Sequence, residues 1–318
     1  MALTAIEVFE NTVYGVGKDL IKENVEVFNG NSKGAIVLSS KSIQGDFEQM
    51  MDLTLGQDLI KSRNPYANND LTAKNFNRVK DNIVKLGLGL NPIEWTNAEF
   101  NWVKQNPEIA GVKIARAMAN QTAKYMADVA IGAVVTCLNS NTAVKTTIPN
   151  TRKLDHNDLI QAIRPMGDQF NSVELYLMHS TQYFDLLGTT FKNAERLFDF
   201  GGITIMRNAL GQTFLITDNK SLTSTQEDYT VGLKKGSVFV GHEQDFDSVY
   251  DKHGGKENIR HTFQAEWTSS LKVNNYRYKT SDTMNGLTFS AITTANNWER
   301  ISNNVKDETG VIICSRKV

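Results

Sequence analysis

The sequence has little of what marks several common protein classes. Only two cysteines occur among 318 residues, Cys137 and Cys314, which is too few for a disulfide framework. Both lie in apolar stretches, so we expect two buried, reduced thiols, as is usual in a reducing compartment. The formal net charge is -1, so no overall basic field points to a nucleic-acid-binding protein.

Long apolar runs are also missing. The longest, Val129 to Leu138, has about half of the roughly 20 residues that a helix needs to cross a bilayer. The first ten residues, MALTAIEVFE, do not place a charged start before an apolar run, as a secretory signal does. We therefore expect no membrane partner. Hydrophobic residues still make up 40% of the chain, enough for a sizeable core.

The sequence lacks the motifs that usually carry catalysis or cofactor binding. The GVGK stretch from Gly15 to Lys18 lacks the second glycine and the following Ser or Thr of a phosphate-binding loop. No G-x-S-x-G or G-x-G-x-x-G motif is present. His179 stands beside Ser180, but adjacent side chains diverge and no acid is placed to orient the imidazole. We expect Ser180 to cap a helix, and we expect no enzyme activity and no cofactor.

One acidic segment, GHEQDFDSVYDKHGG at 241–255, keeps a metal-dependent hydrolase open as a distant alternative. Carboxylates suit hard cations and imidazoles suit zinc. The ligands would be His242, Asp245, Asp247 and His253. The segment has the composition of a polar loop between strands, where acidic side chains are ordinarily solvated. We favour a solvated or subunit-facing loop and predict no metal.

A long stretch with helical character dominates the chain. Asn106 can cap it, Pro107 suits its first turn, and no further proline interrupts it before Asn139. Its residues, about 33 at 1.5 Å each, make a rod of roughly 50 Å. A compact chain of this length is itself only about 50 Å across. The helix is therefore as long as an ordinary domain is wide.

The polarity of this helix changes along its length. Its polar side chains form one narrow stripe, made of Lys113, Arg116, Asn120, Lys124 and Asp128. Beyond Asp128, the segment from Val129 to Leu138 is apolar or small on every side. We expect the stripe to face solvent or a bound nucleic acid, and the apolar end to be enclosed by the rest of the fold.

The chain before this helix has mixed patterning. VEVF at 25–28 and AIVLSS at 35–40 predict two short strands around a turn at Asn29-Gly30 and Gly34. From Ile43 to about Thr72 the apolar residues lack clean periodicity and turn residues are frequent. This pattern indicates an extended excursion that cannot easily bury itself.

Two further helices are expected before the long one. Apolar residues at three- and four-residue steps predict a helix from Leu71 to Leu86. A shorter helix is expected from Thr96 to Lys104.

The chain after the long helix predicts a compact α/β unit of mixed topology. Helices are expected at 155–166, capped by Asp155, and at 180–188, ended by Gly188. A buried strand is expected from Glu174 to Met178. Two strands around a turn are expected within 202–217, and a hairpin around Lys234-Lys235-Gly236 within 229–241.

A second long element follows. From Ile259 to Val273, apolar residues occupy alternate positions, which predicts a half-buried strand of roughly 50 Å at 3.4 Å per residue. GLTFSAI at 286–292 repeats the alternation and predicts a second strand. Because a strand pair and a helix of matching length suit each other, we expect the helix to lie along a narrow sheet.

The order of these parts resembles the major capsid proteins of tailed bacteriophages, which have the Hong Kong 97 fold. ELYLMHSTQYFDLLG (Glu174 to Gly188) is similar to the family's strand, His-Ser and short helix with Tyr and Leu. TTANNWERI (Thr293 to Ile301) and the following GVIICSR resemble the C-terminal end of some of these coats. The resemblance covers nearly the whole chain and implies an α+β fold, with a long spine helix on a narrow long-stranded sheet and a compact axial domain.

The resemblance also implies how the chain is divided. The expected parts are an N-terminal arm at 1–33, an extended loop at 34–72, a peripheral domain at 73–149 with its spine helix at 107–139, an axial domain at 150–256, and the returning long strands with the C-terminal strand at 257–318.

By this resemblance, the chain self-assembles as hexamers and pentamers into the icosahedral head shell of a tailed phage around double-stranded DNA. It would be located in the virion and assembled in the cytoplasm of the bacterial host. An encapsulin-like nanocompartment shell is the nearest alternative. The short arm favours a separate scaffolding protein, and a portal and a decoration protein would be further partners.

The resemblance assigns roles to two groups of residues. Apolar residues of the extended loop would contact a neighbouring subunit: Ile43, Phe47, Met50, Met51 and Leu53. Three cations of the helix stripe are candidate inner-face contacts to packaged DNA without sequence readout: Lys113, Arg116 and Lys124. The alternative for these cations is an ordinary solvated helix face.

Overall fold

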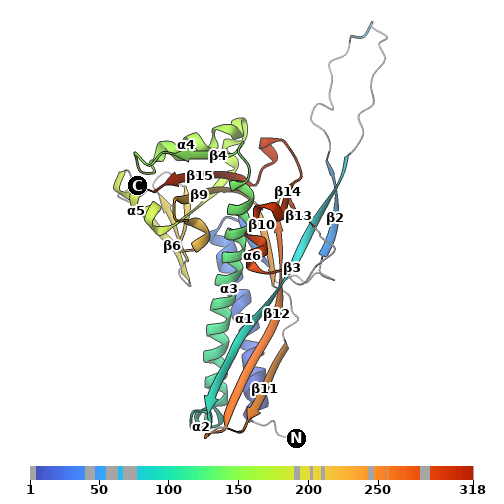
Figure 1. The fold of residues 1–318 in the computed structure, drawn as a ribbon, viewed down its shortest axis with the longest axis vertical. Helices are drawn as coiled ribbons and strands as arrows, with labels where there is room; N and C mark the ends of the chain where they lie inside the picture. Colours follow the sequence, from blue (N-terminus) through green and yellow to red (C-terminus); the bar gives the residue numbers. More distant parts are fainter. Residues whose placement is uncertain are drawn as a thin grey trace.

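The computed structural model describes residues 5–39, 47–54, 64–66, 77–189, 194–200, 203–208, 212–242, 247–255, 257–279 and 287–317. These residues form two units (Figure 1). One is an elongated layer, in which two long helices lie along a long-stranded sheet. The other is a compact unit on a second sheet, which lies against one end of that layer.

The first sheet is organised around one long antiparallel pair. β12 (Arg260–Val273) pairs with β3 (Asn77–Thr96) from Arg260 opposite Thr96 to Leu271 opposite Val84. Among the described residues this sheet has eight strands, and the others are β1 (Ile36–Ser39), β2 (Phe47–Thr54), β10 (Val238–His242), β11 (Asp247–His253), β13 (Tyr276–Tyr278) and β14 (Trp298–Arg300).

The alternation predicted for β12 is confirmed. Every second side chain from His261 to Val273 is buried, while Thr262, Gln264 and Glu266 between them are half-buried or exposed. Ile259 is the exception, because it precedes the strand and is 41% exposed. The buried face of β12, which is apolar except for His261 and Ser269, therefore supplies a floor for the helices.

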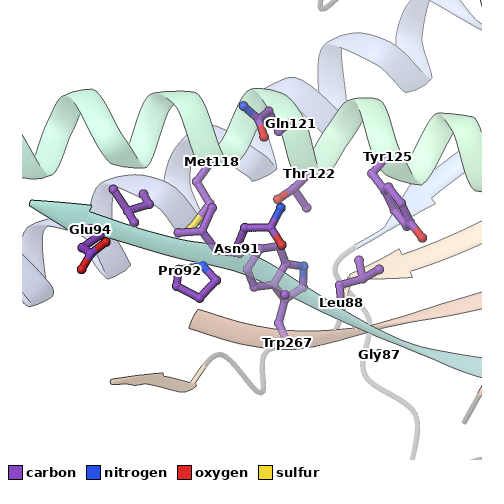
Figure 2. A pocket seen from close by; sticks show the side chains of 13 residues that line it. Gly87, Leu88, Asn91, Pro92, Glu94, Met118, Gln121, Thr122, Tyr125 and Trp267 are labelled. Atoms are coloured by element: carbon purple, nitrogen blue, oxygen red, sulfur yellow. The ribbon is translucent and has the colours of Figure 1, made fainter. Parts of the chain in front are cut away.

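Two helices lie on this floor side by side. α3 (Pro107–Asn139) has the bounds that the sequence predicts, and α1 (Ala5–Asn31) packs along it. Met118 of α3 and Trp267 of β12 both point into the space between helix and sheet (Figure 2). Phe9 of α1 meets Phe263 of β12 edge to face, with ring centroids 5.7 Å apart, so both helices contact the same sheet. α2 (Asn97–Gln105) joins β3 to α3.

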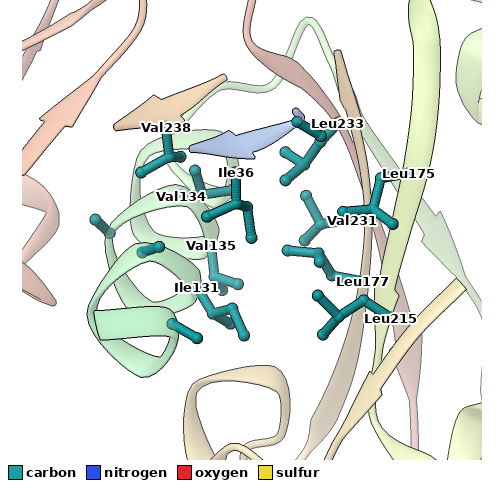
Figure 3. Close-up of a cluster of buried hydrophobic side chains, with 14 of the residues drawn as sticks. Ile36, Ile131, Val134, Val135, Leu175, Leu177, Leu215, Val231, Leu233 and Val238 are labelled. Atoms are coloured by element: carbon teal, nitrogen blue, oxygen red, sulfur yellow. The ribbon is translucent and has the colours of Figure 1, made fainter. Parts of the chain in front are cut away.

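The apolar end of α3 is enclosed between the two sheets, as predicted. From Val129 to Leu138 every residue except Thr136 is buried. Figure 3 shows Ile131, Val134 and Val135 surrounded by side chains of both units. Ile36 and Val238 come from the first sheet, and the second sheet contributes Leu175, Leu177, Leu215, Val231 and Leu233. This contact fixes one unit on the other.

The described part of the second sheet has seven strands in the order β4, β15, β9, β5, β8, β7, β6. Their bounds are β4 (Lys145–Ile148), β5 (Val173–Met178), β6 (Ala194–Phe200), β7 (Ile203–Asn208), β8 (Thr213–Thr217), β9 (Glu227–Lys234) and β15 (Gly310–Arg316). The helical segments around it are α4 (His156–Ile163), α5 (Ser180–Thr189), η1 (Arg164–Ser172) and η2 (Lys220–Leu222). The predicted Asp155 cap is confirmed as a capping box with Asp158.

Two predictions in the N-terminal part are wrong. Residues 25–28 are not a strand but part of α1, because Phe9, Val13, Ile21 and Val25 recur at helical spacing and are all buried. The predicted helix from Leu71 to Leu86 is likewise wrong over its described part, since residues 77–86 belong to β3. Pairing with β2 on one edge and β12 on the other overrides the local helical spacing.

Two predictions in the C-terminal part also need correction. β9 and β10 do not form a hairpin around Gly236, because they enter different sheets and β10 instead pairs with β1 and β12. The described part of 286–292 is not a strand, since Phe289–Ile292 forms the short helix α6. The long partner of β12 is β3.

The two sheets also do not correspond to the predicted parts of the chain on either side of residue 256. β10 and β11 lie within 150–256 but belong to the first sheet, whereas β15 lies within 257–318 and belongs to the second. The remaining 3₁₀ segments, η3 (Ala295–Asn297) and η4 (Val305–Asp307), lie on the return path to β15. The chain therefore crosses between units more often than the sequence indicated.

Close packing of α1 on α3 gives a stability test. A Cβ at Gly111 of α3 would stand 2.9 Å from Thr12 Cβ and 3.2 Å from Phe9 O, whereas one at Gly15 meets nothing within 4 Å. We predict that Gly111→Ala lowers the free energy of unfolding by about 1–3 kcal/mol through overpacking. Gly15→Ala should raise it by about 0.5–1 kcal/mol. Urea unfolding of the two variants measures this, and equal midpoints would contradict the helix pairing.

Candidate functional site

The two units are joined by a polar junction. Here the segments that run from one sheet to the other lie next to each other. Ser237, between β9 and β10, donates its hydroxyl to the carbonyl of Thr309 at 2.6 Å. Lys234 donates its ammonium group to the carbonyl of Lys306 at 2.6 Å. Asn274, after β12, donates its N–H to the carbonyl of Ser237 at 2.9 Å. These bonds link segments from both sheets.

Glu308 lies at the centre of this junction with a fully buried side chain. The Tyr276 hydroxyl donates to its Oε2 at 2.8 Å, and the Asn141 amide donates to its Oε1 at 2.9 Å. The guanidinium of Arg300 forms an ion pair with it. Burial raises the pKa of Glu308, and these partners oppose the shift. The network ties the end of α3 to β13, β14 and the start of β15.

The predicted polar stripe of α3 divides into two parts. Lys113, Arg116 and Lys124 are exposed, as predicted. Asn120 instead accepts a 3.5 Å hydrogen bond from Asn24 of α1, and Asp128 accepts one from Asn219 at 2.7 Å. Burial raises the pKa of Asp128. Only the three cations therefore remain at the surface, and the rest of the stripe helps to hold α3 in place.

The neighbouring surface of α1 carries both signs of charge. Its exposed side chains include Lys18 and Lys22 and also Asp19, Glu23 and Glu26. These acids dilute the positive potential beside the α3 cations. The surface is suited to weak contacts with a polyanion rather than to a tight nucleic-acid site.

The predicted subunit contacts of the extended loop remain predictions. Ile43 lies outside the described residues, and Phe47, Met50, Met51 and Leu53 belong to β2, of whose side chains nothing is described. The strand itself pairs with β3 from Phe47 opposite Val84 to Thr54 opposite Asn77. Figure 1 shows this pair on the far side of the sheet from the compact unit.

Asp218 is a neighbour of His179 and Ser180 that the sequence did not reveal. Asp218 follows β8, and His179 follows β5. Because these two strands are parallel neighbours, their C-terminal ends lie at the same edge of the sheet. The Ser180 hydroxyl donates to its carboxylate, and His179 Nε2 lies 3.6 Å from the same oxygen. Because the Ser180 hydroxyl donates its hydrogen bond to this carboxylate and not to the imidazole, Ser180 and His179 do not form a nucleophile–base pair. His179 Nδ1, rather than Ser180, accepts the Thr181 N–H at the start of α5.

The proposed ligands of the hydrolase alternative are not brought together in the part of the chain that can be described. His242 ends β10, while Asp247 and His253 stand at opposite ends of β11. Asp245 lies outside the described residues. The segment is thus partly a strand rather than a loop, and no group of three potential metal ligands occurs among the described residues. None of the helices described is long and apolar enough to span a bilayer.

Both cysteines are free and buried, which confirms the prediction. Burial raises the pKa of Cys137, and it raises the pKa of Cys314 to about 11. Such thiols stay protonated at neutral pH and are poor nucleophiles.

Comparison with known families identifies the chain. The model of the Gp13-like family, described as major capsid protein 13-like, matches residues 5–312. The chain belongs to this family of major capsid proteins. The family assignment agrees with the long helix, the long strand pair and the compact second unit described above. No curated protein sequence matches the chain.

Solved phage structures share its fold. The cyanophage Pam1 capsid asymmetric unit has a TM-score of 0.54 at 11% identity, covering 88% of each chain. A chain of Microbacterium phage Oxtober96 has a TM-score of 0.52 at 12% identity, covering 89% of this chain and 90% of that one. At such identities the likeness shows the fold alone. It confirms the predicted α+β capsid fold of the Hong Kong 97 type.

The buried carboxylate of the junction gives a pH-dependent prediction for this capsid protein. Because its pKa is raised, folded Glu308 keeps its proton to a higher pH than the unfolded chain does. Its contribution to stability is therefore present at low pH and falls as the pH rises through the folded pKa. We predict that the free energy of unfolding of wild type, minus that of Glu308→Gln, is smaller at about pH 7 than at about pH 4.

Urea titrations of both proteins at the two pH values measure this difference. Glu299→Gln is the matched control, because Glu299 lies on neighbouring β14 and is 47% exposed. A difference that grows with pH for Glu308→Gln, or equal changes for both variants, would contradict the role given to the junction.

Proposed function

We propose that this protein self-assembles as hexamers and pentamers into the icosahedral head shell of a tailed phage, which encloses double-stranded DNA. The observation that carries the proposal is the family match over residues 5–312. The frame of α3 on β3 and β12 supports it, because an elongated, stiff subunit is suited to tiling a thin shell. The protein acts as a structural component rather than as an enzyme.

The proposal extends to contacts between subunits. The extended loop at 34–72, which includes β2, contacts a neighbouring subunit through Ile43, Phe47, Met50, Met51 and Leu53. β2 has only β3 as a strand partner among the described residues, which leaves its outer edge for such a contact. The compact unit on the second sheet packs around the five-fold and six-fold axes. A separate scaffolding protein directs assembly in the host cytoplasm, and a portal and a decoration protein complete the head.

The proposal also gives the exposed cations of α3 a role on the inner surface of the shell. Lys113, Arg116 and Lys124 are exposed along one side of the helix and contact phosphates of the packaged DNA without reading its sequence. The acids of α1 beside them keep this contact weak, so that DNA remains mobile during packaging and release.

Assembly is the direct test of the function. We expect the protein, expressed with the scaffolding protein encoded beside it, to form closed shells of uniform diameter in negative-stain electron micrographs. DNA inside shells isolated from infected cells would favour a phage head, and a packaged enzyme would favour an encapsulin-like compartment. Protein that stays monomeric with and without the scaffold would contradict the proposal.

The DNA contact predicts a charge effect. Changing Lys113, Arg116 and Lys124 together to Gln removes three phosphate contacts, so the slope of log affinity for DNA against log salt should fall by roughly 2.7. Fluorescence anisotropy with isolated capsomers and a DNA duplex measures the slope. Lys252→Gln on β11 is the control for loss of an exposed cation. An unchanged slope in the triple variant would place these cations away from DNA.

A further inference from the structure

The compact unit buries several polar side chains whose hydrogen bonds are incomplete. Gln182 of α5 is 5% exposed, Thr230 of β9 is 0% exposed and Ser315 of β15 is 6% exposed. Each has a buried side-chain oxygen that makes no hydrogen bond with any part of the chain that the structure describes. Because buried polar atoms are nearly always hydrogen-bonded, these oxygens indicate either a loss of stability or a bound ligand that satisfies them.

Asp228 of β9 brings these three residues together. Ser315 lies directly opposite Asp228 in the β9–β15 pair, and opposite residues of an antiparallel pair share one face, with Cβ atoms about 4.5–5.5 Å apart. Thr230 is two residues along β9 from Asp228, so it points to the same face. Gln182 reaches this carboxylate from α5, since its Nε2 donates to Asp228 Oδ2 at 3.4 Å.

This polar group lies on the face of the second sheet that is turned away from α3. Figure 3 shows Val231 and Leu233 of β9 directed toward α3. Thr230 alternates with them along the strand and therefore points the other way. The group is thus separate from the apolar core around α3.

The four side chains offer two hydrogen-bond donors and two acceptors. The hydroxyls of Thr230 and Ser315 can each donate one bond. Gln182 Oε1 only accepts, because the amide nitrogen has to face the Asp228 carboxylate, which itself only accepts. Asp228 Oδ2 has the long bond from Gln182 as its one partner among the described residues. A single water molecule can accept from both hydroxyls and donate to both acceptors, within the two to four bonds of a typical buried water.

The charge of the group selects a neutral ligand. Asp228 is its one ionisable residue, and Lys317 Nζ lies 3.2 Å from Asp228 Oδ1. The Thr223 hydroxyl donates to the same oxygen at 2.5 Å. A bound cation would add a positive charge that the group does not balance, and an anion would meet the carboxylate, so burial of either ion is costly.

We propose that these four side chains bind one buried water molecule, which links α5 to β9 and β15. The water completes the hydrogen bonds of the three orphaned oxygens and of Asp228 Oδ2. All four residues belong to one chain, so the inference is independent of how the subunits assemble.

Replacing one hydroxyl by a methyl group distinguishes a bound water from an unsatisfied cluster. Thr230→Val removes a partner of the water, so we expect the equilibrium constant for unfolding, measured by urea titration, to rise by roughly tenfold. Without a bound water, the same change removes an unpaired buried hydroxyl and leaves the protein equally stable or more stable. That result would overturn the proposal.

Thr213 of β8 is the matched control. It is also 0% exposed, and its hydroxyl likewise has no partner in the described chain. It lies opposite Leu175, on the apolar face that Figure 3 shows. Thr213→Val should therefore leave the urea midpoint unchanged or raise it. Equal losses of stability in the two variants would assign the effect to the valine itself and overturn the proposal.

A map of the wild-type protein that shows ordered water, from crystallography or cryo-electron microscopy, provides the second arm. We expect one peak among the four side chains, at about 2.7–3.0 Å from their oxygens. A map without that peak would overturn the proposal. Distances of about 2.3–2.6 Å would also overturn it, because they are typical of a metal ion.

Discussion

The enclosure of the C-terminal end of α3 is the constraint on which the rest of the structure depends. From Val129 to Leu138 the helix has no polar face, so it must be surrounded by apolar side chains. One sheet cannot do this, and the chain therefore places Val238 of the first sheet and Leu233 of the second against the same turns. The crossings between the sheets then meet around Glu308, whose polar partners close the end of this core. The result is one stiff frame, with an elongated layer and a compact unit fixed at its end.

Local patterns were sufficient to predict the elements that carry their own signals. α3 was predicted with its bounds because Pro107 starts it and its interior has no proline. β12 was predicted because its alternation is long and regular. β3 was not, because the spacing of Val79, Ile83 and Leu86 also fits a helix, and only pairing with distant β12 and β2 decides between the two. α1 was missed because the alternation at 25–28 is local, whereas its buried apolar residues, from Phe9 to Phe28, repeat over about five turns.

The functional surfaces were less predictable than the elements. The exposure of Lys113, Arg116 and Lys124 follows from helical periodicity alone. The inward roles of Asn120 and Asp128 depend on Asn24 and Asn219, which are distant in sequence. Glu308 gives no local sign that three segments converge on it. Each of these features arises from contacts between residues that are distant in sequence, which local sequence patterns do not reveal.

Cryo-electron microscopy of the assembled shell tests the central claim most directly, namely that α3 and its two sheets form one preassembled frame. The predicted density has α3 continuous from Pro107 to Asn139, with Glu308 still between Tyr276 and Asn141 and both sheets arranged as in the single chain. Density in which α3 breaks before Val129, or in which the two sheets have separated at the junction, would contradict this account.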